Sequence, residues 1–513
     1  MKKNFKITLV GALALFVLAG CALAPSGEAE SGGAASSTEP VLVSGATKSA
    51  GSKTDTVDTA DAENESSSFE VDFSVSGRDA SGEYDAAGAV TLSPGDDLTI
   101  TEAGVYILSG TYEDQMILIE AGEEDKVQLV LDNAVITNSS GPAICVLSAD
   151  KVFITAAEGT VNTISDGADY TLADGETEPD AAVYSREDLT INGSGKLTIS
   201  GNYKHAVVSK DDLVVTAKDL SVEAKNVGLS GKDSVTISSA SVSITAGTDG
   251  IRSENGTDSA KGYVAVADSS VTISSGRDGI QAETVFAAQN AEISIKAGGG
   301  SAGESESCKG VKAGVAVTIS SGHYQIDALD DAVHTNGTIL ISGGEFTLES
   351  RDDGVHADEK IEISGGKLDI TACEGVEATK VVVSGGEITI AATDDGINAT
   401  RKCAGLNPSV EISGGTITIT MGAGDTDGID VNGDIAITGG TVYVNGNSSF
   451  DYDGTATFTG GTVIVNGQQV TTIPNQFMGG GMGGFGGQGG TGGFGGGPGG
   501  QGGFGGGPGG RHG

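Results

Sequence analysis

Pairs of acidic residues, each followed by a small and an aliphatic residue, recur at a nearly constant spacing in the second half of the chain. Successive small residues lie 22, 21 and 21 positions apart, at Ala332, Gly354, Gly375 and Gly396. Hard carboxylate oxygens in this number, with backbone carbonyls from the turns beside them, suit Ca²⁺, which accepts roughly 6 to 8 oxygen ligands. We therefore predict calcium binding, with the candidate ligands Asp330, Asp331, Asp352, Asp353, Glu374, Asp394, Asp395, Asp427 and Asp430.

The position two residues after each small residue continues the pattern, and it holds His334, His356, Glu377, Asn398 and Asp430. We expect these side chains to line the same outer groove, with the two histidines as metal ligands, as sugar contacts or simply as solvated groups. The acidic residues have a structural alternative, because Asp beside Gly often caps a turn through hydrogen bonds to backbone N–H groups. That alternative explains single Asp residues well and pairs poorly, since stacked like charges repel unless they take up protons or bind a cation.

A second repeat, Ser or Thr followed by two glycines, lies between short segments in which β-branched and polar residues alternate. Ser364-Gly365-Gly366, for example, follows Ile361-Glu362-Ile363. Such alternation indicates strands with one buried face, and we expect both the glycine pairs and the Asp-Gly steps to serve turns that need positive φ. A period near 22 residues suits a parallel β-helix, with equivalent residues stacked about 4.8 Å apart. We therefore predict an all-β fold, a right-handed parallel β-helix of about 22 residues per rung.

Composition divides the chain into four parts. Residues 1–21 begin with lysines, contain an apolar run too short to span a bilayer, and end in Leu18-Ala19-Gly20-Cys21, which resembles the bacterial lipobox and implies lipidation of Cys21. An ordinary secretory signal that ends in Cys is the alternative. Residues 22–66 form a Ser-, Gly- and Glu-rich tether and residues 478–513 a Gly-rich tail, both expected to be disordered. Residues 67–477 form the repeat domain.

Charge and composition exclude several function classes. The net charge is −42, from 70 acidic and 28 basic residues, which argues against nucleic acid and against direct capture of a polyanion. No glycine-rich phrase opens a helix as a phosphate-binding loop would. With no Trp, an aromatic platform for sugar rings is not evident. The four cysteines besides Cys21 lack metal-binding spacing and are expected to be mostly free, buried thiols; a disulfide at Cys403 stays open.

Together, the lipobox, the tether, the Asp-Asp-Gly phrases, the Ser-Gly-Gly turns and the Gly-rich tail resemble the clostridial carbohydrate-binding β-helix lipoprotein family, whose members are similar to pectate lyases in shape. The resemblance covers about residues 90 to 470. It implies a right-handed parallel β-helix with bound Ca²⁺. It also implies that residues 67–477 bind plant-type polysaccharide such as polygalacturonate or cellulose.

Three function classes remain open. We favour a non-catalytic carbohydrate-binding lipoprotein, in which Ca²⁺ bridges the acidic groove to polysaccharide carboxylates or orders the rungs so that polar side chains meet sugar hydroxyls. This class explains the anchor, the tether and the charge together. We expect a monomer on the extracellular face of the bacterial cell membrane, attached to the membrane through its lipid alone.

The second class is a calcium-dependent polysaccharide lyase, in which the metal acidifies the proton α to a uronate carboxylate and a basic side chain abstracts it. The candidates are Arg277 and Arg351, each beside an Asp, with Lys309 and Lys312 on an adjacent rung. Each is also explained as a partner that offsets the acidic residues, so we predict no catalytic residue. The third class is an adhesin or structural stalk that calcium only stiffens.

Overall fold

The computed structural model describes residues 71–476, except 96–97, 173–174, 300–306 and 424–425. The expected signal peptide with Cys21, the tether and the Gly-rich tail lie outside the described residues. The described part contains one five-residue helix and 43 strands, which confirms the all-β prediction. No helix in that part is long and apolar enough to cross a membrane.

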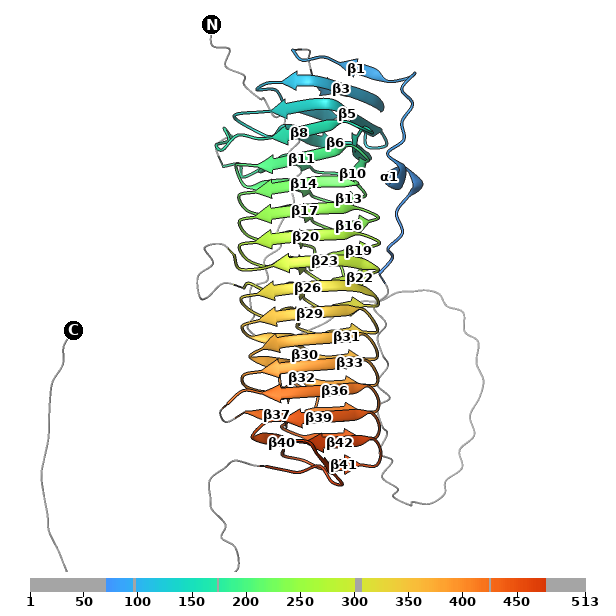
Figure 1. The fold of residues 1–513 in the computed structure, drawn as a ribbon. Helices are drawn as coiled ribbons and strands as arrows, with labels where there is room; N and C mark the ends of the chain where they lie inside the picture. Colours follow the sequence, from blue (N-terminus) through green and yellow to red (C-terminus); the bar gives the residue numbers. More distant parts are fainter. Residues whose placement is uncertain (1–70, 96–97, 173–174, 300–306, 424–425, 477–513) are drawn as a thin grey trace, which may run out of the picture. The chain divides into compact units, whose positions relative to one another are not determined.

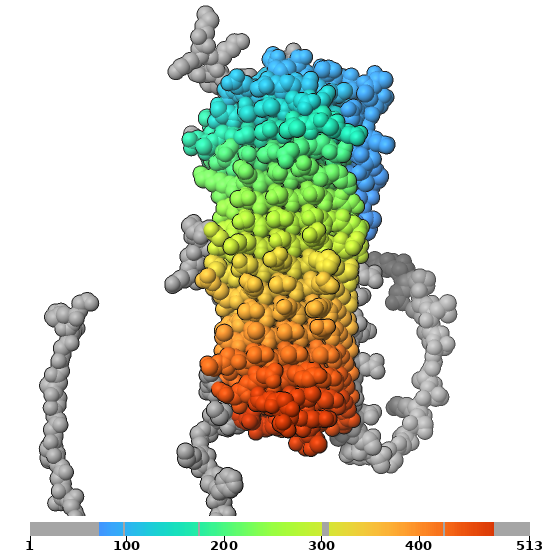
Figure 2. All heavy atoms as spheres, in the orientation of Figure 1, coloured from blue at the N-terminus to red at the C-terminus, as the bar shows by residue number. Residues whose placement is uncertain are grey.

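The strands form a solenoid of stacked parallel strands (Figure 1). Strand β17 (Ser241–Ala246), for example, pairs in parallel with β14 (Asp219–Ala224) on one side and β20 (Ser270–Ser275) on the other. We call the three resulting stacks the first, second and third sheets, and one passage of the chain through all three a rung. The bands of colour in Figure 2 follow one another in chain order, as expected when each rung packs only on its neighbours.

The first sheet carries outward-facing Ser, Thr and charged residues. Besides β14, β17 and β20 it contains β8 (Val161–Ser165), β11 (Lys196–Gly201), β23 (Ala291–Lys296), β26 (Gly322–Ala328), β29 (Glu345–Ser350), β31 (Lys367–Ala372), β33 (Glu387–Ala392), β36 (Thr416–Met421), β39 (Thr441–Asn445) and β42 (Thr462–Val465). The last of these pairs antiparallel with β43 (Gln468–Val470).

The second sheet is built mostly of short strands and carries the acidic repeat. It contains β2 (Thr99–Ile100), β4 (Ile117–Glu120), β6 (Ile144–Ser148), β9 (Ala181–Ser185), β12 (His205–Ser209), β15 (Leu229–Gly231), β18 (Ile251–Ser253), β21 (Ile280–Ala282), β24 (Val311–Ala313), β27 (Val333–Thr335), β30 (Asp353–Ile363), β32 (Glu374–Val383), β34 (Ile397–Ala399), β37 (Asp427–Val431) and β40 (Ser448–Tyr452).

The third sheet shares the long strands β30 and β32 with the second, because those strands run on from one sheet into the next. It also contains β1 (Val90–Leu92), β3 (Gly104–Tyr112), β5 (Lys126–Thr137), β7 (Lys151–Ala156), β10 (Asp188–Gly193), β13 (Asp212–Val215), β16 (Ser234–Ser238), β19 (Tyr263–Ala267), β22 (Val285–Gln289), β25 (Ala316–Ile319), β28 (Thr338–Ile341), β35 (Ser409–Ile412), β38 (Asp434–Ile437) and β41 (Ala456–Phe458).

Alternation along the strands builds the core, as the sequence predicts. In β29, Phe346 and Leu348 are 3 % and 1 % exposed, and the residues between and beside them face outward. In the second sheet, Val333, Val355 and Val376 are register partners and are almost fully buried. Burying such a side chain contributes about 1.5–3 kcal/mol relative to leaving it exposed. A continuous apolar column therefore holds the rungs together.

The glycines of the two repeats are needed for different reasons. In the Ser-Gly-Gly turns the second glycine has positive φ, 93° at Gly366 and 88° at Gly386, as predicted. The same explanation is wrong for the acidic phrases. There a Cβ on Gly375 would lie 2.4 Å from Ile390 Cγ2 and 2.5 Å from the carbonyl oxygen of Gly396. The acidic phrase contains glycine because its backbone presses against the first sheet and the next rung.

The helix α1 (Gly77–Ser81) docks on the third sheet through one buried carboxylate. Asp79 is 4 % exposed and forms an ion pair of 3.0 Å with Lys151. It also accepts a hydrogen bond of 2.6 Å from the Thr190 hydroxyl. The helix is thereby fixed to the side of the solenoid.

No disulfide joins the four cysteines of the described residues. Cys145 and Cys308 are buried, whereas Cys373 and Cys403 are half-buried. Burial raises the pKa of Cys145 to about 12. The prediction of buried, unbridged thiols therefore holds for two residues, and the disulfide left open at Cys403 does not form.

Candidate functional site

Parallel pairing stacks the acidic residues of successive rungs at the start of the second sheet. Asp353 and Glu374 are register partners, and the Asp353 amide donates to Asp331 Oδ1 over 3.1 Å. In the next two rungs, the Gly375 amide donates to the carbonyl oxygen of Asp395 and the Gly396 amide donates to that of Asp427, each over 2.9 Å. We call this set the acidic column; its members are Asp331, Asp353, Glu374, Asp395 and Asp427.

The acidic column continues toward the N-terminus through residues not chosen from the sequence. Backbone hydrogen bonds place Asp249, Asp278 and Lys309 in the rungs before Asp331. Asp249 and Asp278 are 1 % and 0 % exposed. In the sequence, the Asp-Gly-Ile phrases that begin at Asp249 and Asp278 could have identified both residues as members of the column. Lys309 thus inserts one positive charge into a line of carboxylates.

A second line of side chains lies beside the acidic column on the outer surface of the second sheet, and we call it the outer row. His334 pairs with His356, His356 with Glu377, Glu377 with Asn398, and Asn398 with Asp430. The two histidine side chains are 12 % exposed, and Glu377 and Asn398 are buried. The members of the outer row therefore contact each other and the acidic column more than they contact water.

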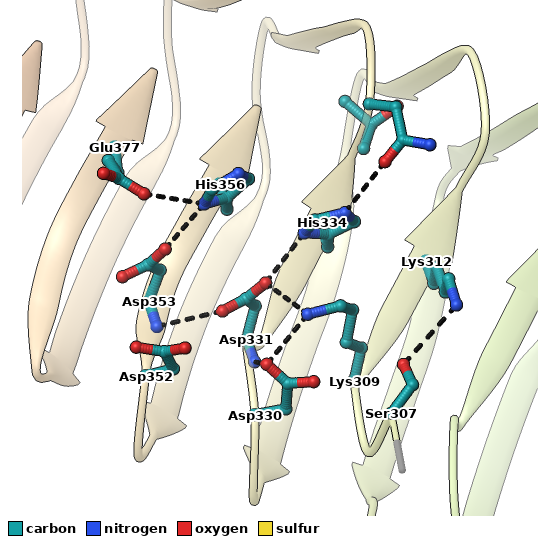
Figure 3. A network of polar contacts seen from close by, with 12 residues as sticks. Ser307, Lys309, Lys312, Asp330, Asp331, His334, Asp352, Asp353, His356 and Glu377 are labelled. Carbon is teal, nitrogen blue, oxygen red and sulfur yellow. Dashed lines mark hydrogen bonds and ion pairs between the residues drawn. The ribbon is translucent and has the colours of Figure 1, made fainter. Parts of the chain in front are cut away.

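In the first rungs of the site, Lys309 and His334 contact the carboxylates (Figure 3). Lys309 Nζ lies 2.8 Å from Asp330 Oδ1 and 2.6 Å from Asp331 Oδ2, and His334 Nδ1 lies 2.7 Å from the same Asp331 oxygen. Burial works to raise the pKa of Asp331, but the hydrogen bond from His334 and the Lys309 ammonium hold it below its ordinary range. Burial works to lower the pKa of Lys309, but these carboxylates raise it, so Lys309 is held protonated.

In the next rung, His356 lies between two carboxylates (Figure 3). Its Nδ1 is 2.6 Å from Asp353 Oδ2 and 2.9 Å from Glu377 Oε2. Burial works to lower the pKa of His356, but the two carboxylates raise it to about 10. Lys402 Nζ binds Glu377 Oε1 at 2.5 Å and helps to hold the pKa of Glu377 below its ordinary value against burial. Lys402 comes from the irregular segment between β34 and β35, which no repeat pattern could place.

The following rungs hold carboxylates with fewer cations near them. Burial, together with neighbouring carboxylates, raises the pKa of Glu374 to about 8, of Asp395 to about 7 and of Asp430 to about 6. Among the described residues, neither Asp395 nor Asp430 forms an ion pair. Repulsion among these carboxylates is therefore offset less by paired cations than in the earlier rungs.

Asn398 lies in this acidic part with one end of its amide unsatisfied. Its Nδ2 donates to Glu374 Oε2 over 3.0 Å and to Glu377 Oε1 over 3.4 Å. Its Oδ1 is buried and accepts no hydrogen bond. Turning the amide over would place the oxygen against those two carboxylates, so the nitrogen is the end that faces them. The amide oxygen of Asn398 therefore faces away from Glu374 and Glu377. The next residue of the outer row after Asn398 is Asp430.

The remaining predicted site residues are more peripheral. Asp352, Asp394 and Arg351 are exposed. Arg277 is half-buried, and its charge acts on Asp249. These positions place neither arginine among the residues that surround His356.

A pair of aromatic rings was not anticipated from composition. Tyr170 and Tyr203 stack with ring centroids 4.2 Å apart and 12° between their planes, and the Lys204 ammonium lies 5.2 Å from the Tyr203 ring. The two tyrosines are 33 residues apart in sequence and in different irregular segments. Only the stacking of the rungs brings them together.

A family model and a curated relative that match this chain carry the same description. The family model described as "Carbohydrate-binding domain-containing protein" matches residues 94–354 and 351–475. A protein of that description from Acetivibrio thermocellus is 43 % identical over 63 residues, which are 12 % of this chain and 22 % of the relative. This chain therefore matches less than a quarter of that relative's length.

A solved structure, that of the polysaccharide lyase-like protein from C. thermocellum in its gadolinium derivative, is 33 % identical. The match covers 45 % of this chain and 96 % of the other, with a TM-score of 0.41.

Proposed function

Because this chain belongs to the carbohydrate-binding domain-containing family, we propose that it is a non-catalytic, calcium-binding lipoprotein that holds polysaccharide at the cell surface. In this proposal the solenoid is a right-handed parallel β-helix of about 22 residues per rung. Cys21 carries the lipid, and a monomer stands on the extracellular face of the membrane. Its ligand is a glycan such as polygalacturonate or cellulose.

The observation that carries the proposal is the outer row of the second sheet. It begins before His334 with Arg252, Gln281 and Lys312, and every member has a side chain able to hydrogen-bond. Parallel strands repeat about every 4.8 Å, so the row offers one polar group at each step along a straight line. A linear polysaccharide laid along the second sheet would meet the half-buried members of the row, whereas Glu377 and Asn398 are buried and contact their neighbours. The half-buried members are Arg252, Gln281, Lys312, His334, His356 and Asp430.

The calcium part of the proposal rests on the acidic rungs after Glu374. The side chains of these rungs that could bind an ion would do so through oxygen, which Ca²⁺ prefers. They are Asp395, Asn398, Asp427 and Asp430. The buried Asn398 Oδ1 without a partner is the atom that such an ion would satisfy. The predicted ligands of the earlier rungs fit less well, because calcium there would displace Lys309 and the two histidines. When bound, the ion would supply positive charge for a polyuronate carboxylate.

The basic side chains support binding over catalysis. A lyase needs a basic group that can accept a proton beside the metal. Lys309 is paired with two carboxylates that keep it protonated, and Lys312 Nζ lies 3.7 Å from the buried Asp278. Both lysines therefore balance acidic charge, which is the structural role considered for them from the sequence.

Retention of the full chain on polygalacturonate and on cellulose, with calcium and with chelator, tests the proposal. We expect retention in calcium, less retention in chelator, and no absorbance from unsaturated products in the same tubes. The double variant Asp395→Asn/Asp430→Asn should lose the calcium dependence. Asp327→Asn/Asp369→Asn, which removes the same charge from exposed positions on the first sheet, should keep it. Rising absorbance would instead identify a lyase, and no retention on any glycan would reject carbohydrate binding.

A further inference from the structure

Three metal-binding side chains converge at His356, outside the oxygen-only set of the later rungs. The ligand atoms of Asp353, His356 and Glu377 all lie within 4.8 Å of one another. His356 Nδ1 lies 2.6 Å from Asp353 Oδ2 and 2.9 Å from Glu377 Oε2. The three side chains are 6 %, 12 % and 6 % exposed. One nitrogen and two carboxylate oxygens thus face a common point at the edge of solvent.

The other nitrogen of His356 is also held. Nε2 lies 3.4 Å from Asp358 Oδ1, two residues along the same strand. Metal-binding histidines almost always donate their second N–H to a carboxylate or a carbonyl, which fixes the ring and leaves the first nitrogen for the metal. Asp358 would keep the proton on Nε2 and turn Nδ1 toward Asp353 and Glu377.

The preceding rung repeats this arrangement with one ligand fewer. His334 Nδ1 faces Asp331 and its Nε2 lies 3.2 Å from Asn336 Oδ1. The third member of a site there would have to be His356, whose Nδ1 already faces its own two carboxylates. The complete set of three ligands is therefore the one around His356.

Carboxylates outnumber lysines around this set. The acidic column and its neighbours contribute six carboxylates here, from Asp330, Asp331, Asp352, Asp353, Glu374 and Glu377. Among the described residues, Lys309 and Lys402 form ion pairs with members of this set, and so do the side chains of His334 and His356. The position that a metal ion would take lies between His356 Nδ1 and the facing oxygens of Asp353 and Glu377.

We propose that Asp353, His356 and Glu377 bind a transition-metal divalent cation of the Zn²⁺ type, with Asp358 positioning the histidine. Imidazole nitrogen with carboxylate oxygens is a ligand set for Zn²⁺ and its neighbours, whereas Ca²⁺ takes oxygen ligands. Three protein ligands leave one position for water or for a ligand oxygen. The chain would then hold two kinds of cation, calcium in the rungs of Asp395 to Asp430 and zinc at His356.

Calorimetric titration of Zn²⁺ into the full chain tests this inference, after removal of metals and with calcium present throughout. We expect a zinc site that His356→Ala abolishes and that Asp358→Asn weakens about 10- to 100-fold. His323→Ala is the matched control, because His323 also faces a carboxylate, that of Glu345, but its side chain is 70 % exposed on the first sheet. This control should leave zinc binding unchanged.

Thermal unfolding in zinc and in chelator gives a second measurement. Zinc should raise the midpoint of the wild-type chain and not that of His356→Ala. Asp358 has an exposed fraction of 37 % in its side chain, so Asp358→Asn keeps the test valid if His356→Ala does not fold. Equal zinc binding by the wild type and both variants, or no zinc binding by the wild type, would overturn the proposal. Calcium-dependent glycan retention is measured separately and does not depend on this outcome.

Discussion

The imidazole rings of His334 and His356 stack in parallel, with their centroids 4.8 Å apart and 16° between their planes. The two residues are 22 positions apart in sequence and are register partners in the second sheet. Their contact shows how the solenoid works. A chemical group repeated in the sequence becomes a line of groups at the strand spacing, so every charge in the line acts directly on its neighbours.

Lys309→Met should destabilise the protein by about 3 kcal/mol at pH 7. The substitution leaves Asp330 and the buried Asp331 without their lysine, and removal of one partner from a buried ion pair is costly. Unfolding in urea, with chelator present, measures the loss. Lys296→Met is the control, because its pair with Asp327 is exposed and should contribute less than about 1 kcal/mol. Equal losses in the two variants would contradict the assigned role of Lys309.

Gly375→Ala should reduce stability by about 1–3 kcal/mol through overpacking. The added methyl group would meet Ile390 and the carbonyl oxygen of Gly396. Ala332 occupies the equivalent position two rungs earlier, so the expected effect is local repacking without loss of the fold. Gly77→Ala serves as the control, since a Cβ there meets nothing within 4 Å. Denaturant midpoints compare the variants, and an unchanged midpoint in Gly375→Ala would refute the steric explanation.

Glu374→Gln should make stability less dependent on pH. Burial, with Glu377 nearby, raises the folded-state pKa of Glu374 to about 8, so the folded state binds a proton that the unfolded state has lost above about pH 4.5. The stabilisation by this proton is complete below pH 4.5 and is lost as the pH rises to 8. The wild type should therefore lose more stability than the variant between pH 5 and pH 8.5, by about 1–2 kcal/mol after allowance for solvent screening. Urea midpoints in chelator check this, and parallel curves would contradict it.

Calcium should stabilise the wild-type chain and fail to stabilise Asp395→Asn. The ion would bind the folded state alone, so the unfolding midpoint should rise with calcium concentration. In chelator, Asp395→Asn should be at least as stable as the wild type, because it removes one of several crowded carboxylates. Thermal scans in both buffers provide the test. Equal destabilisation of the variant in both buffers would indicate that Asp395 caps a turn through the Asp427 amide, its hydrogen-bond donor at 3.0 Å.

The fold could be predicted because a solenoid is a local structure. Alternating residues such as those around Ile361 define strands, the second glycine of each Ser-Gly-Gly phrase defines a turn, and the spacing defines which residues stack. Register follows from these features without any long-range folding argument. The stacking of the acidic column and of the outer row was predicted correctly for this reason. The expected outer groove was not, because Asp331, Asp353 and Glu377 are buried.

The sequence by itself determined which side chains stand in line, and only the tertiary structure decided which of them are charged and paired. Lys402 reaches Glu377 from an insertion that follows no repeat, and Lys309 reaches two carboxylates of the next rung. Whether a carboxylate keeps its proton depends on burial and on cations within a few ångströms. Those cations come from neighbouring rungs and loops, so the spacing of the repeat does not predict them.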